Sequence, residues 1–274
     1  MPIIQKILEW QALQTKPLLI GVNGAQGTGK TTFSYFVAEY ISDYYGLNTV
    51  VLSLDDFYKT KSERIALADA VHPLLKTRGA PGTHDLSLAF QALSECLDKK
   101  LKKTIRTPRF RKEIDDRADP CDWHDIQAPV DIVLFEGWCV SARPETQEAL
   151  KTPINSLEEK EDAQGIWRAY VNDCLASTYA DLFTLLDYTI MLKAPNFDQI
   201  IEWRMEQENK LRESSKSLKD VSKHHYMSQD TLKYFIAHYE RLTQSMLHEM
   251  PNYADIVLSF NPDRSFKKLL EKNG

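Results

Sequence analysis

The sequence predicts an α/β fold of three layers, in which helices cover both faces of a five-stranded parallel sheet. Short apolar runs alternate with amphipathic helical patterns along the chain, as expected for parallel strands joined by crossover helices. A glycine-rich loop separates the first apolar run from the first long helical pattern. The 274 residues contain no internal repeat and suffice for one domain with insertions, so we expect a single domain over residues 1–274.

Five apolar runs are predicted to form the strands, and they are residues 18–22, 48–54, 130–135, 188–192 and 254–260. Helical spacing of apolar residues lies between them, and a short amphipathic helix over residues 1–13 is expected to pack rather than to act in targeting. Two polar stretches, 152–165 and 214–225, are interpreted as mobile insertions. The second comes after a long charged helix, so we expect insert or lid segments near 152–165 and 196–226, including a helical lid.

The loop after the first strand, residues 21–32, reads GVNGAQGTGKTT and matches G-x-x-x-x-G-K-[ST], the Walker A phosphate-binding loop. Its glycines let consecutive backbone N–H groups form a concave anion site that Cβ atoms would obstruct. Lys30 can then reach the β- and γ-phosphates, and the Thr31 hydroxyl can hold Mg²⁺. A glycine turn without a ligand is the alternative, but the order strand, loop, helix favours nucleotide binding. The predicted nucleotide-binding residues are Gly24, Ala25, Gln26, Gly27, Thr28, Gly29, Lys30, Thr31 and Thr32.

Carboxylates come directly after the second and third predicted strands, at the edge where ligands of open α/β sheets bind. Asp55 could accept a proton from a substrate hydroxyl that attacks the γ-phosphate. Glu136 stands where an acid holds Mg²⁺ directly or through water. The alternatives are an Asp55-Asp56 pair that caps a turn and a solvated Glu136, and the neighbouring phosphate loop favours catalysis. The aromatic Tyr58 near Asp55 is expected to line the acceptor site.

Two loops carry candidates for binding a small acidic acceptor. In the first, capping of the next helix explains Thr83 and Asp85. Capping leaves Arg78 and His84 of the same loop unexplained. In the second loop, residues 107–117, mixed charge is typical of a solvated loop, yet guanidinium groups suit a carboxylate substrate. The residues expected to bind the acceptor, besides Asp55 and Tyr58, are Arg78, His84, Asp85, Arg109 and Arg117.

An arginine on the predicted helix over residues 197–212 is a further catalytic candidate. Arg204 could stabilise the γ-phosphate charge as an arginine finger supplied in cis by a closing helix. An ordinary surface pair with Glu208, four residues further on, explains Arg204 equally well. The predicted catalytic residues are Lys30, Asp55 and Arg204, and the predicted metal ligands are Thr31 and Glu136.

Composition narrows the classes of partner. The net charge of -5 argues against a general nucleic-acid binder. No apolar run approaches the length of a membrane span, and the N-terminus lacks the apolar core of a signal peptide. The four cysteines are scattered without a C-x-x-C pair, which indicates reduced thiols and a cytoplasmic location. We expect a small-molecule acceptor as the partner, and the sequence leaves the oligomeric state open.

These motifs resemble the phosphoribulokinase, uridine kinase and pantothenate kinase group of P-loop kinases, through the Walker A loop, D-x-F-Y after the second strand and E-G after the third. The chain resembles plant-type D-glycerate 3-kinase and its fungal and bacterial relatives more closely. The segments that carry this resemblance are Arg78-Gly79, Gly82-Thr83-His84-Asp85, Pro108-Arg109-Phe110, Phe135-Glu136-Gly137-Trp138, Trp203-Arg204 and Gln207-Glu208. The sequence departs from the motifs of this family at three places. Arg111-Lys112 stands in place of the frequent D-K, Asp116-Arg117 lacks the glycine of G-D-R, and residues 139–144 differ from the usual family sequence.

The resemblance implies a P-loop NTPase fold with strand order 2-3-1-4-5, counted along the chain, and ATP and Mg²⁺ as cofactors. It also implies that Asp55 is the general base, Glu136 the metal-side acid and Arg204 the lid arginine. The implied reaction is phosphorylation of D-glycerate to 3-phosphoglycerate. The residues that would pair with the glycerate carboxylate are one or more of Arg78, Arg109 and Arg117.

Two other functions stay open at this point. A uridine or pantothenate kinase would keep the mechanism and change only the acceptor pocket. An NTP-hydrolysing switch or assembly factor is the alternative from another class. Against it, the chain has no guanine-reading N/T-K-x-D segment and no evident glutamine positioned for water.

Overall fold

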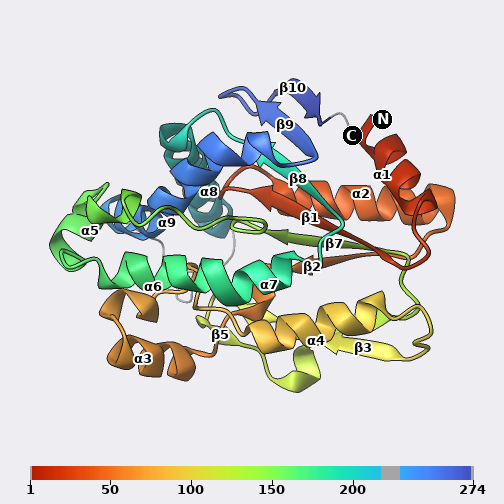
Figure 1. Ribbon diagram of the computed structural model, residues 1–274, viewed down its shortest axis with the longest axis horizontal. Coiled ribbons are helices and arrows are strands. Elements are labelled where there is room, and N and C mark those ends of the chain that lie inside the picture. Colours follow the sequence, from red (N-terminus) through yellow and green to blue (C-terminus); the bar gives the residue numbers. More distant parts are fainter. Residues whose placement is uncertain (1, 217–228, 273–274) are drawn as a thin grey trace.

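A computed structural model describes residues 2–216 and 229–272 of the chain (Figure 1). In these residues, the central sheet has six strands in the order β10-β9-β8-β1-β7-β2. The parallel strands are β1 (Leu18–Gly24), β2 (Thr49–Ser53), β7 (Ile132–Gly137), β8 (Tyr188–Lys193) and β9 (Ile256–Phe260). The predicted order of these five strands is confirmed. The sequence did not predict β10 (Phe266–Glu271), which pairs antiparallel with β9 at the edge.

The central strands are apolar because the sheet is covered on both faces. Every residue of β1 and of β7 is buried, and continuous apolar runs are typical of central parallel strands. The strand register sets Glu136 of β7 beside Val22 of β1 and Ser53 of β2. The phosphate loop, Asp55 and Glu136 therefore emerge at the same edge of the sheet.

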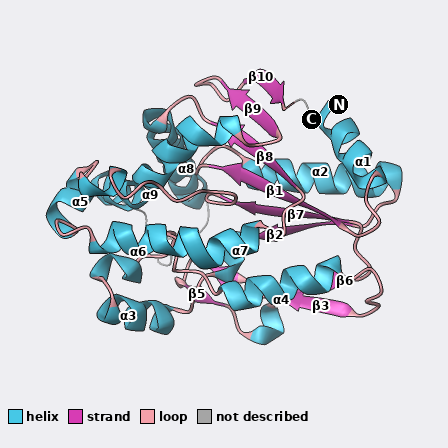
Figure 2. Cartoon of the chain, viewed as in Figure 1, coloured by secondary structure: helices cyan, strands magenta, loops and turns pink. Residues whose placement is uncertain are grey.

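Helices cover both faces of the sheet, as predicted (Figure 2). The helices on one face are α1 (Pro2–Ala12) and α2 (Lys30–Tyr45), which share an apolar cluster with the strands. The other face is covered by α4 (Leu86–Leu97), α6 (Ile166–Cys174), α7 (Ala180–Phe183) and α9 (Gln229–Glu249). A π-helical turn, η5 (Leu175–Tyr179), joins α6 to α7. Within the described ranges, no helix combines the length and the apolar character that crossing a membrane requires.

The helix α8 (Phe197–Lys216) packs beside the phosphate loop. Its Trp203 belongs to an apolar cluster that also contains Ala25 of the loop and residues of α9. This helix begins the expected lid segment 196–226. Most of the expected insertion 214–225, and residues 217–226 of the expected lid segment, lie outside the described residues.

Between β2 and β7 the chain forms an insertion whose strands were not predicted. The helix α3 (Lys61–Ala70) precedes two small antiparallel sheets. One pairs β3 (Thr104–Thr107) with β6 (His124–Gln127), and the other is a hairpin of β4 (Phe110–Arg111) and β5 (Asp116–Arg117). The expected solvated loop over residues 107–117 is thus partly a hairpin. Strands of two residues with mixed charge show no apolar alternation, so the pattern could not predict them.

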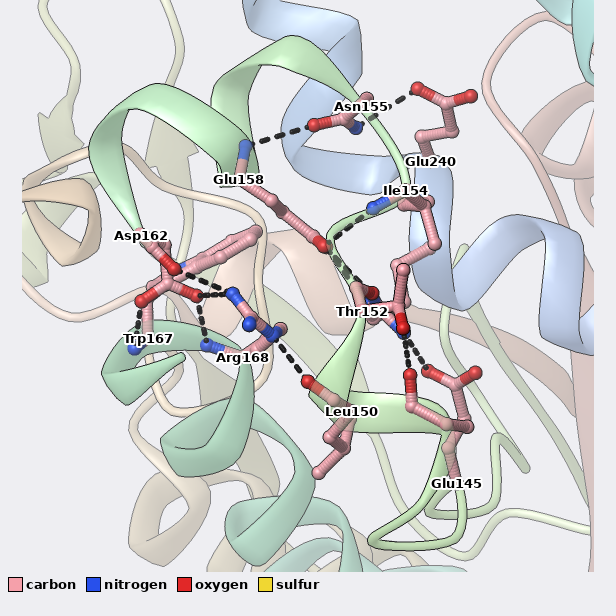
Figure 3. A network of polar contacts seen from close by, with 12 residues as sticks. Glu145, Leu150, Thr152, Ile154, Asn155, Glu158, Asp162, Trp167, Arg168 and Glu240 are labelled. Atoms are coloured by element: carbon pink, nitrogen blue, oxygen red, sulfur yellow. Dashed lines mark hydrogen bonds and ion pairs between the residues drawn. The ribbon is translucent and has the colours of Figure 1, made fainter. Parts of the chain in front are cut away.

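The polar stretch 152–165 contains buried as well as exposed residues (Figure 3). It contains α5 (Ser156–Glu161), and Glu158 and Asp162 are 0% and 2% exposed. Asp162 pairs with Arg168 of α6 at 2.9 Å, and Glu158 pairs with Arg241 of α9 at 2.7 Å. Proteins bury charges when the charges are paired and hydrogen-bonded. Two of the acidic residues of this stretch therefore belong to a buried ion-pair network.

Candidate active site

The phosphate loop joins the end of β1 to the start of α2. Gly27 and Gly29 both have a φ of +83°, in the left-handed region that favours glycine. A Cβ on Gly24 would lie 2.6 Å from Thr28 Oγ1, and this hydroxyl donates to the Ala25 carbonyl at 2.8 Å. Gly29 is the N-cap residue of α2 and has no side chain to cap it. The first N–H groups of α2 and the positive end of its dipole are therefore available to an anion.

A cavity of about 340 Å³ lies beside this loop. The predicted nucleotide-binding residues that line it are Gln26, Gly27, Gly29, Lys30, Thr31 and Thr32. The predicted residues that line it from other elements are Asp55, Tyr58, Arg78 and Arg204. Gly24, Ala25 and Thr28 do not line the cavity and form the base of the loop. One volume thus joins a phosphate site to a carboxylate and two arginines.

Thr31 and Glu136 lie together as the predicted metal ligands. The Thr31 hydroxyl donates to Glu136 Oε1 at 2.8 Å, and Lys30 Nζ lies 3.9 Å from Glu136 Oε2. Burial raises the pKa of Glu136, although Lys30 acts in the opposite direction. Oε2 is buried and has no hydrogen-bond partner among the described residues.

This donor set fits Mg²⁺. A buried carboxylate oxygen without a hydrogen-bond partner, beside a hydroxyl, suits a hard cation that prefers oxygen ligands. The described residues hold no group of three or more His, Cys, Asp or Glu that could bind a metal. That is compatible with Mg²⁺, which uses one or two protein ligands together with phosphate oxygens and water.

Asp55 lies in the turn η1 (Leu54–Phe57) directly after β2, and both of its oxygens are engaged. Oδ1 accepts a hydrogen bond from the Tyr58 hydroxyl at 2.9 Å, and Oδ2 accepts one from Lys112 Nζ at 2.7 Å. Burial raises the pKa of Asp55, but the charges of Lys112 and Lys30 outweigh burial and hold this pKa below its usual range. Asp55 is therefore an ionised carboxylate inside the cavity.

Arg78 lies in the cavity beside Asp55 and is tied to the surrounding loops. Its guanidinium pairs with Asp115, which lies in the turn after β4 and also pairs with Arg64 at 3.0 Å. The Arg78 carbonyl accepts a hydrogen bond from the Tyr239 hydroxyl of α9 at 3.0 Å. Of the three arginines expected to pair with a carboxylate, Arg78 is the one that lines the cavity.

Four of the expected acceptor-binding residues, Arg109, Arg117, Asp85 and His84, lie outside the cavity lining. Arg109 is exposed. Arg117 donates to the Tyr58 carbonyl at 2.9 Å and pairs with Asp85 at 3.2 Å. Asp85 also accepts from the Leu88 N–H, so Asp85 is the N-cap of α4. The alternative interpretation expected Thr83 in this position, but the Thr83 hydroxyl donates to the Ala80 carbonyl instead.

His84 is the fourth of these residues and lies behind Tyr58. It is 2% exposed, and its ring stacks on the Tyr58 ring with centroids 4.4 Å apart. Its Nδ1 lies 2.6 Å from the Tyr179 hydroxyl. His84 therefore supports Tyr58, which in turn holds Asp55, and does not contact the cavity.

Arg204 occupies a position that serves both interpretations of this residue. It lines the cavity, and its Nη1 lies 3.3 Å from Glu208 Oε2 on the same helix. The i,i+4 pair on α8 holds the guanidinium at the cavity wall.

Five cavity residues were missed as site residues in the sequence. They are Lys112 in the turn after β4, Trp138 after β7, Gln207 of α8, and Phe235 and Tyr239 of α9. Trp138 donates from Nε1 to the Gly79 carbonyl at 3.0 Å, and its ring meets that of Tyr239 edge-on. The position of Trp138 directly after Glu136-Gly137 could have indicated it. Tyr239 comes from a distant helix whose apolar spacing indicated only a core position.

No family model matches the chain. Over 256 residues it is 28% identical to the chloroplastic D-glycerate 3-kinase of Arabidopsis thaliana, covering 90% of this chain and 51% of that protein. The chain thus spans about half the length of that relative. It is 27% identical to mug58, an uncharacterized kinase of Schizosaccharomyces pombe, covering 94% of this chain and 95% of that protein.

A solved structure shares the fold. The D-glycerate 3-kinase from Cryptococcus neoformans var. grubii matches with a TM-score of 0.79 and 23% identity, covering 98% of this chain and 99% of that chain. At this identity the match shows the fold alone. In sequence and in fold the chain is similar to P-loop kinases. Within that class, the resemblance to D-glycerate 3-kinase and its fungal relatives is confirmed.

Proposed function

We propose that the protein transfers the γ-phosphoryl group of ATP to a hydroxyl of a small hydroxy acid, and that D-glycerate, converted to 3-phosphoglycerate, is this acceptor. The cavity carries the proposal, because a phosphate loop, the ionised Asp55 and the cations Arg78 and Lys112 line one volume of about 340 Å³. The similarity to a D-glycerate 3-kinase supports the choice of acceptor. All four cysteines are free thiols, which is compatible with the predicted cytoplasmic location.

The phosphate side of the cavity binds the nucleotide. The N–H groups of the loop and the Lys30 ammonium bind the β- and γ-phosphate oxygens. Thr31 and Glu136 would hold Mg²⁺, which supplies further positive charge to those oxygens when bound. Arg204 neutralises charge on the transferred group from the α8 side.

The acceptor side supplies the base. Asp55 takes the proton of the acceptor hydroxyl as the hydroxyl oxygen attacks the γ-phosphorus. A bond forms between that oxygen and phosphorus, the bond to the β,γ-bridging oxygen breaks, and ADP leaves. Tyr58 holds Asp55 in place through the 2.9 Å hydrogen bond to Oδ1.

A substrate panel tests this function. Small hydroxy acids, glycerol, pantothenate and nucleosides are offered with ATP and Mg²⁺, ADP release is monitored, and products are identified by mass spectrometry. D-Glycerate is expected to give the highest kcat/KM and 3-phosphoglycerate as product. Turnover of a nucleoside or pantothenate in its place would reassign the acceptor. ADP release at one rate with and without any acceptor would contradict phosphotransfer and favour the NTP-hydrolysing switch.

A further inference from the structure

Lys112 is the cation that the hairpin of β4 and β5 contributes to the cavity. Its Nζ donates to Asp55 Oδ2 at 2.7 Å. The Lys112 side chain is 60% exposed and that of Asp55 is 22% exposed, so the lysine covers the carboxylate from the solvent side. Among the described residues, Asp55 is the only carboxylate that pairs with Lys112.

The other cations of the cavity pair with carboxylates that the proposed reaction does not use as a base. Arg78 pairs with Asp115, and Arg204 pairs with Glu208. These pairs can persist while phosphoryl transfer takes place. Lys112, in contrast, pairs with the proposed base itself, so its pairing has to change when Asp55 accepts a proton.

The pair with Lys112 opposes the proposed role of Asp55. Tyr58 occupies Oδ1 and Lys112 occupies Oδ2, so neither oxygen is free of a strong donor. Burial raises the pKa of Asp55, but Lys112 and Lys30 outweigh it and lower this pKa. A base of lowered pKa has a weaker driving force for taking a proton, so catalysis benefits when Lys112 leaves.

The hairpin allows the ammonium to move without moving its strands. The Phe110 N–H donates to Asp56 Oδ1 at 3.0 Å, and Asp116 Oδ1 accepts from the Lys61 N–H at 2.9 Å. These bonds fix both strands to the body of the domain. The residues of the turn, from Lys112 to Ile114, are exposed. The flexible four-carbon stem of lysine can therefore redirect its ammonium within the cavity.

We propose that Lys112 exchanges one carboxylate for another: it pairs with Asp55 in the free enzyme and with the carboxylate of the acceptor in the complex. The inference rests on the proposed function. The exchange keeps the ammonium paired throughout and leaves Asp55 Oδ2 open to the acceptor hydroxyl. A neutral alcohol brings no anion, so the Lys112–Asp55 pair persists and the base stays engaged. Lys112 is in this way a specificity-determining residue for hydroxy acids.

Calorimetry tests the exchange, because protein saturated with ADP binds the acceptor without turnover. D-Glycerate is titrated into the wild type, Lys112→Gln, Asp55→Asn and the double variant. We expect Asp55→Asn to bind D-glycerate more tightly than the wild type, since the competing carboxylate is gone. Lys112→Gln is expected to bind about 10- to 100-fold more weakly. The double variant should bind no more tightly than Lys112→Gln.

Two calorimetric results would overturn the exchange. One is weaker binding of D-glycerate by Asp55→Asn than by the wild type, because Asp55 would then assist rather than compete. The other is unchanged binding by Lys112→Gln. Arg111→Gln is the matched control, since Arg111 neighbours Lys112 on the hairpin, is exposed and does not line the cavity.

Kinetics test the specificity separately. The ratio of kcat/KM for D-glycerate to kcat/KM for glycerol is expected to fall about tenfold or more in Lys112→Gln. Lys112→Arg should retain most of this ratio, and Arg111→Gln should retain all of it. An equal fall of kcat with both acceptors and an unchanged ratio would assign Lys112 to the phosphate side and overturn the inference. Absence of wild-type turnover with every acid of the panel would refute the proposed function instead.

Discussion

At the scale of single residues, two adjacent carboxylates serve different purposes. Asp55 lies in the cavity, where Lys112 and Lys30 outweigh burial and lower its pKa. Asp56 accepts from the Phe110 N–H at 3.0 Å and thereby fixes the hairpin, and burial raises its pKa. The sequence left two interpretations open, a catalytic base or a turn cap. In the structure, the contact that Asp56 makes is with the hairpin rather than with its own turn, and the role of Asp55 as the base stays a prediction.

Replacement of the proposed base is the first prediction. We expect Asp55→Asn to lower kcat by about 10²- to 10⁴-fold, the usual size of general-base catalysis. Nucleotide affinity should be kept, because Asp55 does not belong to the phosphate loop. ADP release and a nucleotide titration measure the two quantities. Asp56→Asn is the control, since an amide oxygen can still accept from the Phe110 N–H. Near-normal turnover of Asp55→Asn would remove Asp55 from this role.

The buried His84 leads to a prediction about stability and pH. Burial lowers its pKa from 6.5 to about 3. Between these values the unfolded chain binds a proton at this histidine and the folded protein does not. The contribution of His84 to stability is therefore present above pH 6.5 and is lost as the pH falls, by at most about 1.4 kcal/mol per pH unit.

Denaturant unfolding at several pH values measures this contribution. The free energy of unfolding of His84→Gln is expected to fall less steeply than that of the wild type between pH 6.5 and 4. Identical slopes for the wild type and His84→Gln would contradict the neutral, buried state of His84.

At the scale of elements, the phosphate loop depends on its contact with α8. A Cβ on Gly27 would lie 2.9 Å from the Cβ of Trp203, which is 1% exposed. Trp203 is itself fixed, because its Nε1 donates to the Pro262 carbonyl at 2.7 Å. Gly29 has the same φ of +83°, but a Cβ there would meet no atom within 4 Å. A side chain at either glycine would strain the backbone, but only a side chain at Gly27 would also collide with a neighbouring residue.

This difference predicts unequal effects of two alanine substitutions on stability without nucleotide. Both Gly27→Ala and Gly29→Ala should lose about 1 to 2 kcal/mol, because alanine is strained in the left-handed region. Gly27→Ala should lose more, since neither backbone nor the fixed Trp203 can move away easily. Urea unfolding of both variants measures the difference. Equal losses would show that the contact between the loop and α8 contributes little.

At the scale of the whole molecule, the sequence predicts the features that local patterns determine. Apolar runs placed the five parallel strands, and residues at strand ends placed Asp55 and Glu136 at one edge of the sheet. The spacing of residue types along the sequence did not indicate that Lys112 or Tyr239 lines the cavity, because a hairpin turn and a distant helix bring them there. Arg117 and His84 suited an acidic substrate by residue type alone. Their burial and partners depend on tertiary packing, which a pattern of residue types does not contain.

The buried network between α5, α6 and α9 predicts a large effect on stability far from the cavity. Arg241→Ala would leave Glu158, which is 0% exposed, without its arginine and should cost about 3 to 5 kcal/mol of unfolding free energy. Lys151→Ala removes an exposed pair with Glu148 and should change stability by less than about 0.5 kcal/mol. Denaturant unfolding compares the two, and similar small losses would contradict a structural role for the network.

The two sides of the cavity come from different parts of the chain, and this has a consequence for how such a protein can change. Lys30, Thr31 and Glu136 belong to the central sheet and its first crossover helix. Tyr58, Arg78 and Lys112 all belong to the segment between β2 and β7. We therefore expect that redesign confined to this segment changes the acceptor and leaves the residues that bind the donor nucleotide unaltered.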